Sequence, residues 1–405
     1  MSVRGVDRMA VRAGAHDDRE SVLALTRSLV RIPSRSRIDS YEPIVDYLMT
    51  WMASHGLPAA VLRDTAGNAV AVTAQISGAA GSHWVLDACL DTAPFGDESA
   101  WAHSPTSAVI QNGWMYGRGS SDSKVAIAIF CHLAVRLQAA RHRLHGTLSL
   151  LFDLDEHTGG FAGAKAFFEG SQGNAVRPDG VMIGYPGLDA LVIGGRGVHR
   201  LQIDVHGVAS HSGGRVGTPN AVDKAADLIR RLRATPIPAT GTTHFPPEAK
   251  ITVTAISGGQ GFSITPDLCH LNVDIRTTPT FDDEAATQHI AEIVASVDKD
   301  WTATPATRVQ LLLHWPAYAL DKESPLRATI IASAAGHGIR VRPKIAGPSN
   351  IGNYLAELGI PATAGFGVVH AGLHATDERF RIDSVPAVQA IYHESLLMLM
   401  SPKLR

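Results

Sequence analysis

The chain is 405 residues long, and its 36 Lys and Arg residues against 38 Asp and Glu residues give a formal net charge of −2. That length suits one large domain or two ordinary ones. A hydrophobic fraction of 45% with 18% charged residues excludes intrinsic disorder. The near-neutral charge argues against nucleic acid or a polybasic membrane surface as partners. No apolar run approaches the roughly 18 residues that span a bilayer.

The amino-terminal segment and the cysteines bear on location. Residues 1–19 mix Arg with Asp and contain no apolar stretch, so they do not resemble a signal peptide. We expect residues 1–16 to form a flexible arm. The 3 cysteines cannot all pair and lack metal-finger spacing. A reducing cytoplasm is therefore the predicted location.

The first part of the chain, residues 1–194, alternates helices with strands. The apolar spacing predicts helices over residues 17–30, 44–55 and 125–137, and strands over residues 69–74, 84–90, 147–154 and 181–184. Strands separated by helices indicate a mostly parallel sheet that is covered on both faces.

A different pattern occupies residues 195–314. It predicts strands over residues 199–206, 250–256, 269–276 and 308–314, and helices over residues 220–233 and 281–297. This order is that of a ferredoxin-like α+β unit. The α/β pattern resumes over residues 315–405, with helices at 326–336, at 351–358 and from 385, and a strand at 362–366. The predicted fold is one α/β domain interrupted by a smaller inserted domain.

Polar residues follow several of the predicted strands. Polar runs come directly after three predicted strands, and the loop beyond the last strand carries two histidines. These residues are Asp91, the run Asp155, Glu156 and His157, Tyr185, and His370 with His374. Ligands in open α/β sheets bind at the carboxyl ends of strands. Each residue alone has an ordinary explanation, such as a solvated loop side chain, but their common position predicts a functional site.

The segment before the helix at 125–137 carries the most specific motif. Residues 117–124 read GRGSSDSK and resemble the GRGxxDxK signature of the co-catalytic metallopeptidases, which include aminoacylase, acetylornithine deacetylase, succinyl-diaminopimelate desuccinylase and carboxypeptidase G. Asp122 alone could simply cap the helix. Further segments resemble the family's motifs in the family's order: CLD at 89–91, DEHTGG at 155–160, ASHSG at 209–213, DIR at 274–276 and HATDE at 374–378. The resemblance implies a metallopeptidase-like catalytic domain, with residues 195–314 as a lid that dimerises.

The resemblance also implies a metal site. In the family two metals share one carboxylate, here Asp122, and the other ligands of one metal fall on His157 and His374. Two imidazoles and a carboxylate suit one divalent transition metal, Mn²⁺ or Zn²⁺, with positions left open for water and substrate.

The ligands of the family's other metal fall on Cys89 and Tyr185. A neutral tyrosine, with a pKa near 10, is a poor substitute for a carboxylate. We therefore predict one metal ion per chain. A Cys89 thiolate would nevertheless bind zinc well, so a second ion is the alternative. The simplest interpretation of Cys89 by itself is a small buried hydrophobic residue.

The remaining roles are also implied by the resemblance. Glu156 is the expected general base, which takes a proton from metal-bound water and returns it to the leaving nitrogen. In the family the residue at Asp91 orients the ligand histidine that Cys89 replaces here, so Asp91 remains a catalytic candidate that steers water or substrate. His211 would reach the substrate oxygen of a partner subunit. Arg276 and Arg215 are candidates for binding a substrate carboxylate, since the guanidinium fork suits it. The expected assembly is a lid-mediated homodimer, or a larger homo-oligomer.

The resemblance therefore implies a metal-dependent hydrolase that cleaves a C–N bond of a small carboxylate-bearing substrate through metal-bound hydroxide. The leading specific candidate is deamination of 5-nitroanthranilate to 5-nitrosalicylate and ammonia, the reaction of a divergent relative. Tyr185 would then be an aromatic wall of the substrate site, whereas Ser263 replaces the Asn that the family uses on amide substrates. The alternatives are an amide hydrolase (a deacylase of N-acyl amino acids, a dipeptidase or a carboxypeptidase) and a catalytically dead binding protein.

Overall fold

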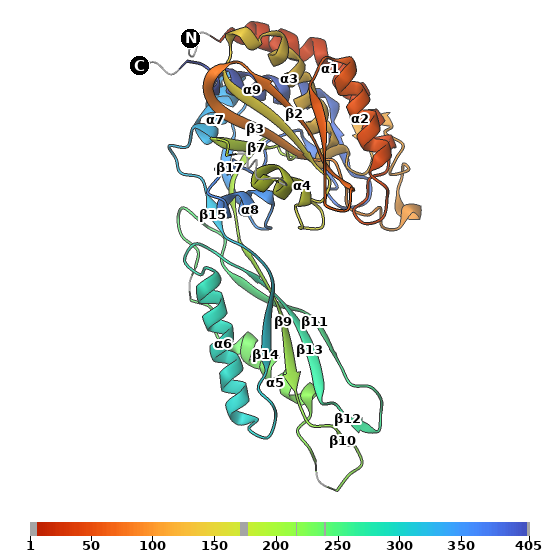
Figure 1. Ribbon diagram of the computed structural model, residues 1–405, viewed down its shortest axis with the longest axis vertical. Helices are drawn as coiled ribbons and strands as arrows, with labels where there is room; N and C mark the ends of the chain where they lie inside the picture. Colours follow the sequence, from red (N-terminus) through yellow and green to blue (C-terminus); the bar gives the residue numbers. More distant parts are fainter. Residues whose placement is uncertain (1–5, 171–176, 216, 239, 403–405) are drawn as a thin grey trace. The chain divides into compact units, whose positions relative to one another are not determined.

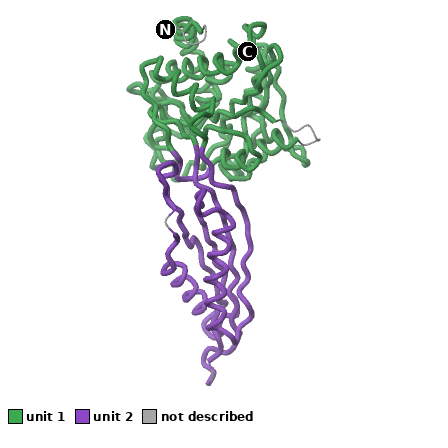
Figure 2. Tube along the Cα trace, turned by 90° about the vertical axis from the view of Figure 1, so that its left-hand side faces the viewer, with its two compact units in different colours: residues 1–193, 320–344, 350–405 green, residues 194–319, 345–349 purple. Residues whose placement is uncertain are grey.

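A computed structural model describes residues 6–170, 177–215, 217–238 and 240–402. The chain forms two compact units (Figure 2). The first comprises residues Met1–Ile193, Leu320–Lys344 and Asn350–Arg405, and the second comprises Gly194–Ala319 and Ile345–Ser349. The expected insert at 195–314 falls inside the second unit. None of the helices in the described ranges is both long and apolar enough to cross a membrane.

The first unit is an α/β domain. Its helices are α1 (Arg8–Arg31), α2 (Glu42–Ser54), α3 (Val125–Ala139), α4 (Ala162–Lys165), α7 (Pro325–Gly336), α8 (Ile351–Glu357) and α9 (Val385–Leu399). Its main strands are β1 (Ala59–Arg63), β2 (Ala69–Ser77), β3 (Ala79–Cys89), β6 (His145–Asp153), β7 (Gly180–Ile183) and β17 (Ala362–Thr363). Short strands form a second sheet, namely β4 (Ile110–Gln111), β5 (Trp114–Tyr116), β18 (His370–Ala371) and β19 (Arg379–Arg381).

The main sheet has the order β1-β2-β6-β3-β7-β17. Strands β6, β3, β7 and β17 run parallel to one another, whereas β2 is antiparallel to both of its neighbours, β1 and β6. The carboxyl-terminal halves of β3 and β6 are buried throughout, as expected for central strands covered on both faces. Helix α3 packs against both strands, and α1 and α9 pack against α3 (Figure 1). The chain continuing from β3, β6 and β7 carries the polar residues singled out in the sequence.

The expectation of a flexible arm over residues 1–16 is wrong from Arg8 onward. Helix α1 begins there, capped by the Asp7 side chain, which accepts hydrogen bonds from two backbone N–H groups. Val11 and Ala15 are buried in a cluster with α9, and the Arg8 guanidinium lies 2.6 Å from the Glu394 carboxylate of that helix. These contacts hold the amino-terminal turns in place. Residues 1–5 lie outside the described residues.

The second unit is built around one antiparallel sheet. Its strands and helices are β9 (Val198–His206), β10 (Ser210–His211), α5 (Ala221–Ala234), β11 (Lys250–Gly258), β12 (Ile264–Thr265), β13 (Leu268–Arg276), α6 (Asp283–Asp300), β14 (Arg308–Trp315) and β15 (Tyr318–Ala319). The strand order β11-β13-β9-β14 confirms the predicted ferredoxin-like arrangement. Apolar residues of β9 and β13 form one core with α5 and α6. A further sheet has the order β15-β8-β16, with β8 at Ala190–Gly195 and β16 at Arg342–Ala346.

Candidate metal centre

The segment that leads into α3 is fixed by a buried ion pair. The Glu378 carboxylate accepts hydrogen bonds from the backbone N–H groups of Ser121 (3.1 Å) and Asp122 (3.2 Å). Its other oxygen lies 2.7 Å from a guanidinium nitrogen of Arg118. The Arg118 and Glu378 side chains are 3% and 0% exposed, respectively. Both side chains of this ion pair are excluded from water and hydrogen-bonded. The pair therefore holds the Asp122 backbone in place without using the Asp122 side chain.

Asp122 does not cap α3, because the N-cap residue is Lys124 and makes no side-chain cap bond. Instead its Oδ2 atom lies 2.7 Å from Nε2 of His374 and 3.7 Å from Nε2 of His157. The three side chains offer ligand atoms that all lie within 4.8 Å of one another. The His157 side chain is buried and that of His374 is 53% exposed. This set fits a divalent transition metal that is bound by the buried side chains of Asp122 and His157 and is accessible to solvent on the side of His374.

The charges of the cluster also suit a cation. Burial raises the pKa of Asp122, but the His157 and His374 imidazoles outweigh it and hold that pKa well below its usual range. Burial lowers the pKa of His157, whereas Asp122 and Asp91 raise it to about 11. Without a metal, His157 is therefore protonated, and its positive charge takes the place of the metal ion's. Metal binding would release that proton.

His157 faces a second carboxylate with its other ring nitrogen. Nδ1 lies 3.4 Å from Oδ2 of Asp91 and 3.5 Å from Oε2 of Glu156. Asp91 is 0% exposed and accepts hydrogen bonds from the Ser36 hydroxyl (2.5 Å) and from the backbone N–H groups of Glu156 (3.3 Å) and His157 (3.1 Å). Asp91 therefore anchors the segment that carries both the expected base and one expected metal ligand.

Glu156 lies among like charges. Burial is the main reason that its pKa rises to about 8, and the Asp122 and Asp91 carboxylates raise it further, whereas His157 opposes them. Its side chain remains 26% exposed. A carboxyl group with a raised pKa beside a metal cluster can accept and return a proton near neutral pH.

Cys89 and Tyr185 occupy the expected second metal position. The Cys89 thiol lies 3.6 Å from Oδ1 of Asp122 and 3.2 Å from the Ser123 hydroxyl. Burial and the nearby carboxylates raise the pKa of this thiol well above its usual value. Burial raises the pKa of Tyr185 as well, with a further rise from Asp122 and Glu156. Cys89, Asp91 and His157 do form a second group of candidate ligand atoms, but the neutral phenol and thiol make it a weaker cation site than the first.

Comparison with known proteins settles the family. The profile of Peptidase family M20/M25/M40 matches residues 85–398. The chain belongs to this family. It is a metal-dependent hydrolase of carbon–nitrogen bonds, as the resemblance to co-catalytic metallopeptidases implies. The matched residues begin within β3 and end within α9.

Individual similar proteins show how far the likeness extends. Succinyl-diaminopimelate desuccinylase from Stenotrophomonas maltophilia is 29% identical over 326 residues, which are 76% of this chain and 82% of that protein. Aminopeptidase PepT from Bacillus cereus superimposes with a TM-score of 0.74 at 16% identity, covering 94% and 99% of the two chains. The YXEP protein of Bacillus subtilis, a dinuclear metal-binding peptidase, gives a TM-score of 0.70 at 16% identity, covering 95% and 99%. At these identities the two structures show a shared fold.

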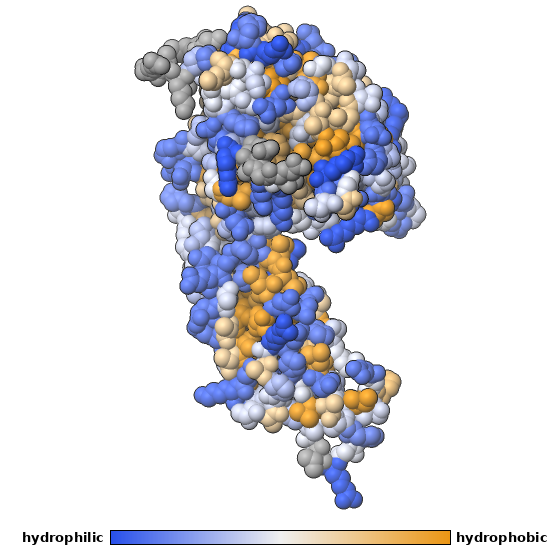
Figure 3. Space-filling view, in the orientation of Figure 1, coloured by the Kyte–Doolittle hydropathy of each residue, from blue (hydrophilic) through white to orange (hydrophobic). Residues whose placement is uncertain are grey.

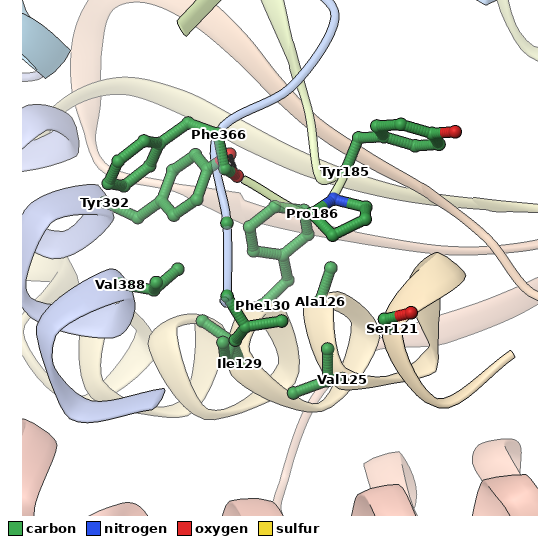
Figure 4. A pocket seen from close by; sticks show the side chains of 12 residues that line it. Ser121, Val125, Ala126, Ile129, Phe130, Tyr185, Pro186, Phe366, Val388 and Tyr392 are labelled. Atoms are coloured by element: carbon green, nitrogen blue, oxygen red, sulfur yellow. Dashed lines mark hydrogen bonds between the residues drawn. The ribbon is translucent and has the colours of Figure 1, made fainter. Parts of the chain in front are cut away.

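A small apolar pocket borders the segment after β7 (Figure 4). The space inside it that the centre of a water molecule can reach is only about 10 Å³, which is room for about one water molecule. Figure 4 shows the Tyr185 ring pointing away from Phe130 and Tyr392. None of the lining residues is charged; they are Ser121, Val125, Ala126, Ile129, Phe130, Tyr185, Pro186, Phe366, Gly367, Val368, Val388 and Tyr392. The pocket therefore offers no ion-pair partner for a substrate carboxylate.

The remaining site candidates belong to the second unit. His211 is exposed, and its Nδ1 accepts a hydrogen bond from the Gly213 backbone (3.0 Å), which leaves the Nε2 proton free to donate. Arg215 is exposed. Arg276 donates to Asp274 (2.9 Å) and to the Ser349 hydroxyl (3.1 Å). The roles of His211, Arg215 and Arg276 toward substrate stay predictions.

Sequence reasoning missed the residues that support the site. Arg118 and Glu378 belong to the motifs at 117–124 and 374–378, but nothing in the spacing of these motifs indicated that the two side chains form an ion pair. Ser36 carried no signal, because a single serine near a helix end is common. The only hint available was that Arg118 and Glu378 are charged residues inside motifs that otherwise supply metal ligands.

Proposed function

We propose that this chain hydrolyses the amide bond of a small N-acylated amino acid or dipeptide, with one divalent metal held by Asp122, His157 and His374. The observation that carries the proposal is the convergence of these three side chains beside Glu156, whose raised pKa suits a general base. The desuccinylase relative supports an N-acyl amino acid as the substrate class, because its name denotes removal of a succinyl group from the nitrogen of an amino acid.

In this reaction Glu156 carries out the proton transfers, and Arg118 and Glu378 hold the site in place. A metal bound at the cluster would supply a Lewis acid that polarises the scissile carbonyl and lowers the pKa of water. Glu156 takes the proton of the attacking water and delivers it to the leaving nitrogen. Arg118 and Glu378 keep Asp122 in place through this cycle, since both are buried and bonded.

We propose one metal ion rather than two. The YXEP structure is described as dinuclear, but here the second position has a thiol that contacts Asp122 and a tyrosine. Asp91 is a poor additional ligand, because its oxygens already accept three hydrogen bonds. Mn²⁺ and Zn²⁺ are the metals that two imidazoles and a carboxylate favour.

We further propose that two chains pair through the second unit and that His211 acts on the substrate of the partner subunit. Edge strand β14 exposes Val309, Leu311 and Leu312, and hydrophobic surface is visible on this unit in Figure 3. Exposed apolar edge strands are rarely left uncovered. Arg276 and Arg215 are then candidates for the substrate carboxylate.

The dimer proposal has a direct test. If Glu156 and His211 of one site come from different chains, mixing inactive Glu156→Gln and His211→Ala proteins restores up to about a quarter of wild-type activity, because half of the dimers carry one intact site. No recovery after verified subunit exchange would contradict the proposal.

A second candidate function is deamination of 5-nitroanthranilate. The relatives reported above are a desuccinylase and peptidases and do not support it. The observation in its favour is the aromatic ring of Tyr185 within electrostatic reach of Asp122 and Glu156. It therefore ranks below amide hydrolysis.

The deciding experiment loads the protein with Mn²⁺ or Zn²⁺ and offers N-succinyl and N-acetyl amino acids, dipeptides and 5-nitroanthranilate. We expect release of a free amine from at least one amide, absent in Glu156→Gln. Ammonia from 5-nitroanthranilate without any amide hydrolysis would select the second candidate. No turnover by a protein with metal bound would identify a binding protein.

A further inference from the structure

The imidazole of His157 lies between two buried carboxylates. Its Nε2 faces Asp122 at 3.7 Å, and its Nδ1 faces Asp91 at 3.4 Å. The Nδ1 atom is buried and has no hydrogen-bond partner among the described residues. A buried nitrogen without a partner costs free energy unless a small movement completes a bond. The 3.4 Å separation from Asp91 is only slightly longer than an ordinary N–H···O bond.

The tautomer of His157 follows from this arrangement. A histidine binds a metal through the lone pair of one nitrogen, and the other nitrogen then carries the proton. Since Nε2 is the atom that faces Asp122, the proton must be on Nδ1, which lies within 3.5 Å of carboxylate oxygens of both Asp91 and Glu156.

Asp91 is the better acceptor of the two carboxylates. It is fully buried and its orientation is fixed by the Ser36 hydroxyl and by two backbone N–H groups. Glu156 is 26% exposed and must exchange protons with water and substrate. A carboxylate that is already held in place orients an imidazole at little entropic cost.

We propose that Asp91 is a positioning residue that accepts the Nδ1 proton of His157 and thereby directs Nε2 toward the metal. The inference rests on the proposed function, because it assumes that His157 is a ligand. Asp91 thus acts through His157 and not on the substrate, which differs from the catalytic role expected from the sequence.

A double-mutant cycle on metal affinity tests the proposal. In the wild-type background Asp91→Asn should weaken Mn²⁺ binding by about 10–100-fold, the usual effect of removing a carboxylate partner from a ligand histidine. In the His157→Glu background the same change should weaken binding by less than about twofold, the scatter of independent sites. Equal losses in both backgrounds would show that Asp91 only supports the local fold and would overturn the proposal.

Two further measurements keep the test decisive. Ser36→Ala removes one of the three hydrogen bonds that orient Asp91 but leaves the imidazole–carboxylate pair, so its loss of metal affinity should be smaller than that of Asp91→Asn. A loss as large as that of Asp91→Asn would overturn the proposal. Ring-nitrogen NMR of Zn²⁺-loaded wild-type protein reports the tautomer without any substitution. Protonated Nδ1 supports the proposal, and protonated Nε2 overturns it. Wild-type protein that binds no metal would instead remove the proposed function itself.

Discussion

Oδ2 of Asp122 lies 2.7 Å from Nε2 of His374, although 252 positions separate the two residues in the chain. The Arg118–Glu378 pair maintains this relationship, because Glu378 binds the Asp122 backbone and an Arg118 nitrogen lies 3.3 Å from the His374 carbonyl oxygen. The M20 site is therefore assembled by bonds between two distant motifs of the same unit.

Glu156→Gln should separate chemistry from metal binding. The amide cannot accept a proton, so we expect kcat to fall by about 10²–10⁴-fold. Metal affinity should stay within about twofold of wild type, because Glu156 is not one of the proposed ligands. Steady-state kinetics and calorimetric metal titration check the two quantities. Full activity in this variant would exclude Glu156 as the base.

Glu378→Gln should weaken both the fold and the metal site. Removing one partner of a buried ion pair costs about 3–5 kcal/mol, and the Asp122 backbone loses an ionised acceptor. Asp383→Asn is a matched control, because its partner Arg381 forms a solvent-exposed pair in the same unit. Urea unfolding and metal titration of both variants check the prediction. Equal effects in the two variants would contradict the supporting role of Glu378.

Acidification should destabilise the contact between α1, α7 and α9. Burial holds the pKa of His337 below its usual 6.5, and for Glu394 the Arg8 pair outweighs burial and holds the pKa below its usual 4.5. Both folded pKa values are depressed, so this stability is present above the ordinary pKa values and is lost as the pH falls.

The measurement is the urea unfolding midpoint at pH 7.5 and at pH 5. The midpoint should be lower at pH 5, and His337→Gln should reduce that difference, because glutamine does not titrate. Arg8→Ala should lower the midpoint at both pH values. An unchanged midpoint in Arg8→Ala would show that the first turns of α1 do not contribute to stability.

Much of the architecture follows from periodicity. The long elements α3, β6, β9 and α6 were predicted to within a few residues because each has a long run of regularly spaced apolar side chains. The short strands of the second sheet of the first unit, such as β5 and β19, were missed because two or three residues show no period. The amino-terminal turns of α1 were missed because they are mostly polar, and two small apolar residues fix them against α9.

Only those residues of the candidate site that belong to sequence motifs could be predicted. Asp122, His157 and His374 were predicted as a group and the structure brings them together. The contact of Asp91 with His157 could not be read from the sequence, since it depends on how the ends of β3 and β6 lie side by side. The same holds for the contact of Cys89 with Asp122.

Restoring ligands should restore a second metal. In the double variant Cys89→His with Tyr185→Glu, both altered positions regain residue types that bind transition metals. We expect about two ions per chain in the double variant and about one in either single variant, by elemental analysis. One ion in the double variant would show that other features of the site exclude the second metal.

The most direct test of the proposed centre is the metal content of the wild-type chain after loading with excess Mn²⁺ or Zn²⁺ and desalting. We predict one tightly bound ion per chain, lost in His374→Ala and retained in Cys89→Ser. Two ions per chain in the wild type, with one lost in Cys89→Ser, would contradict the single-metal account.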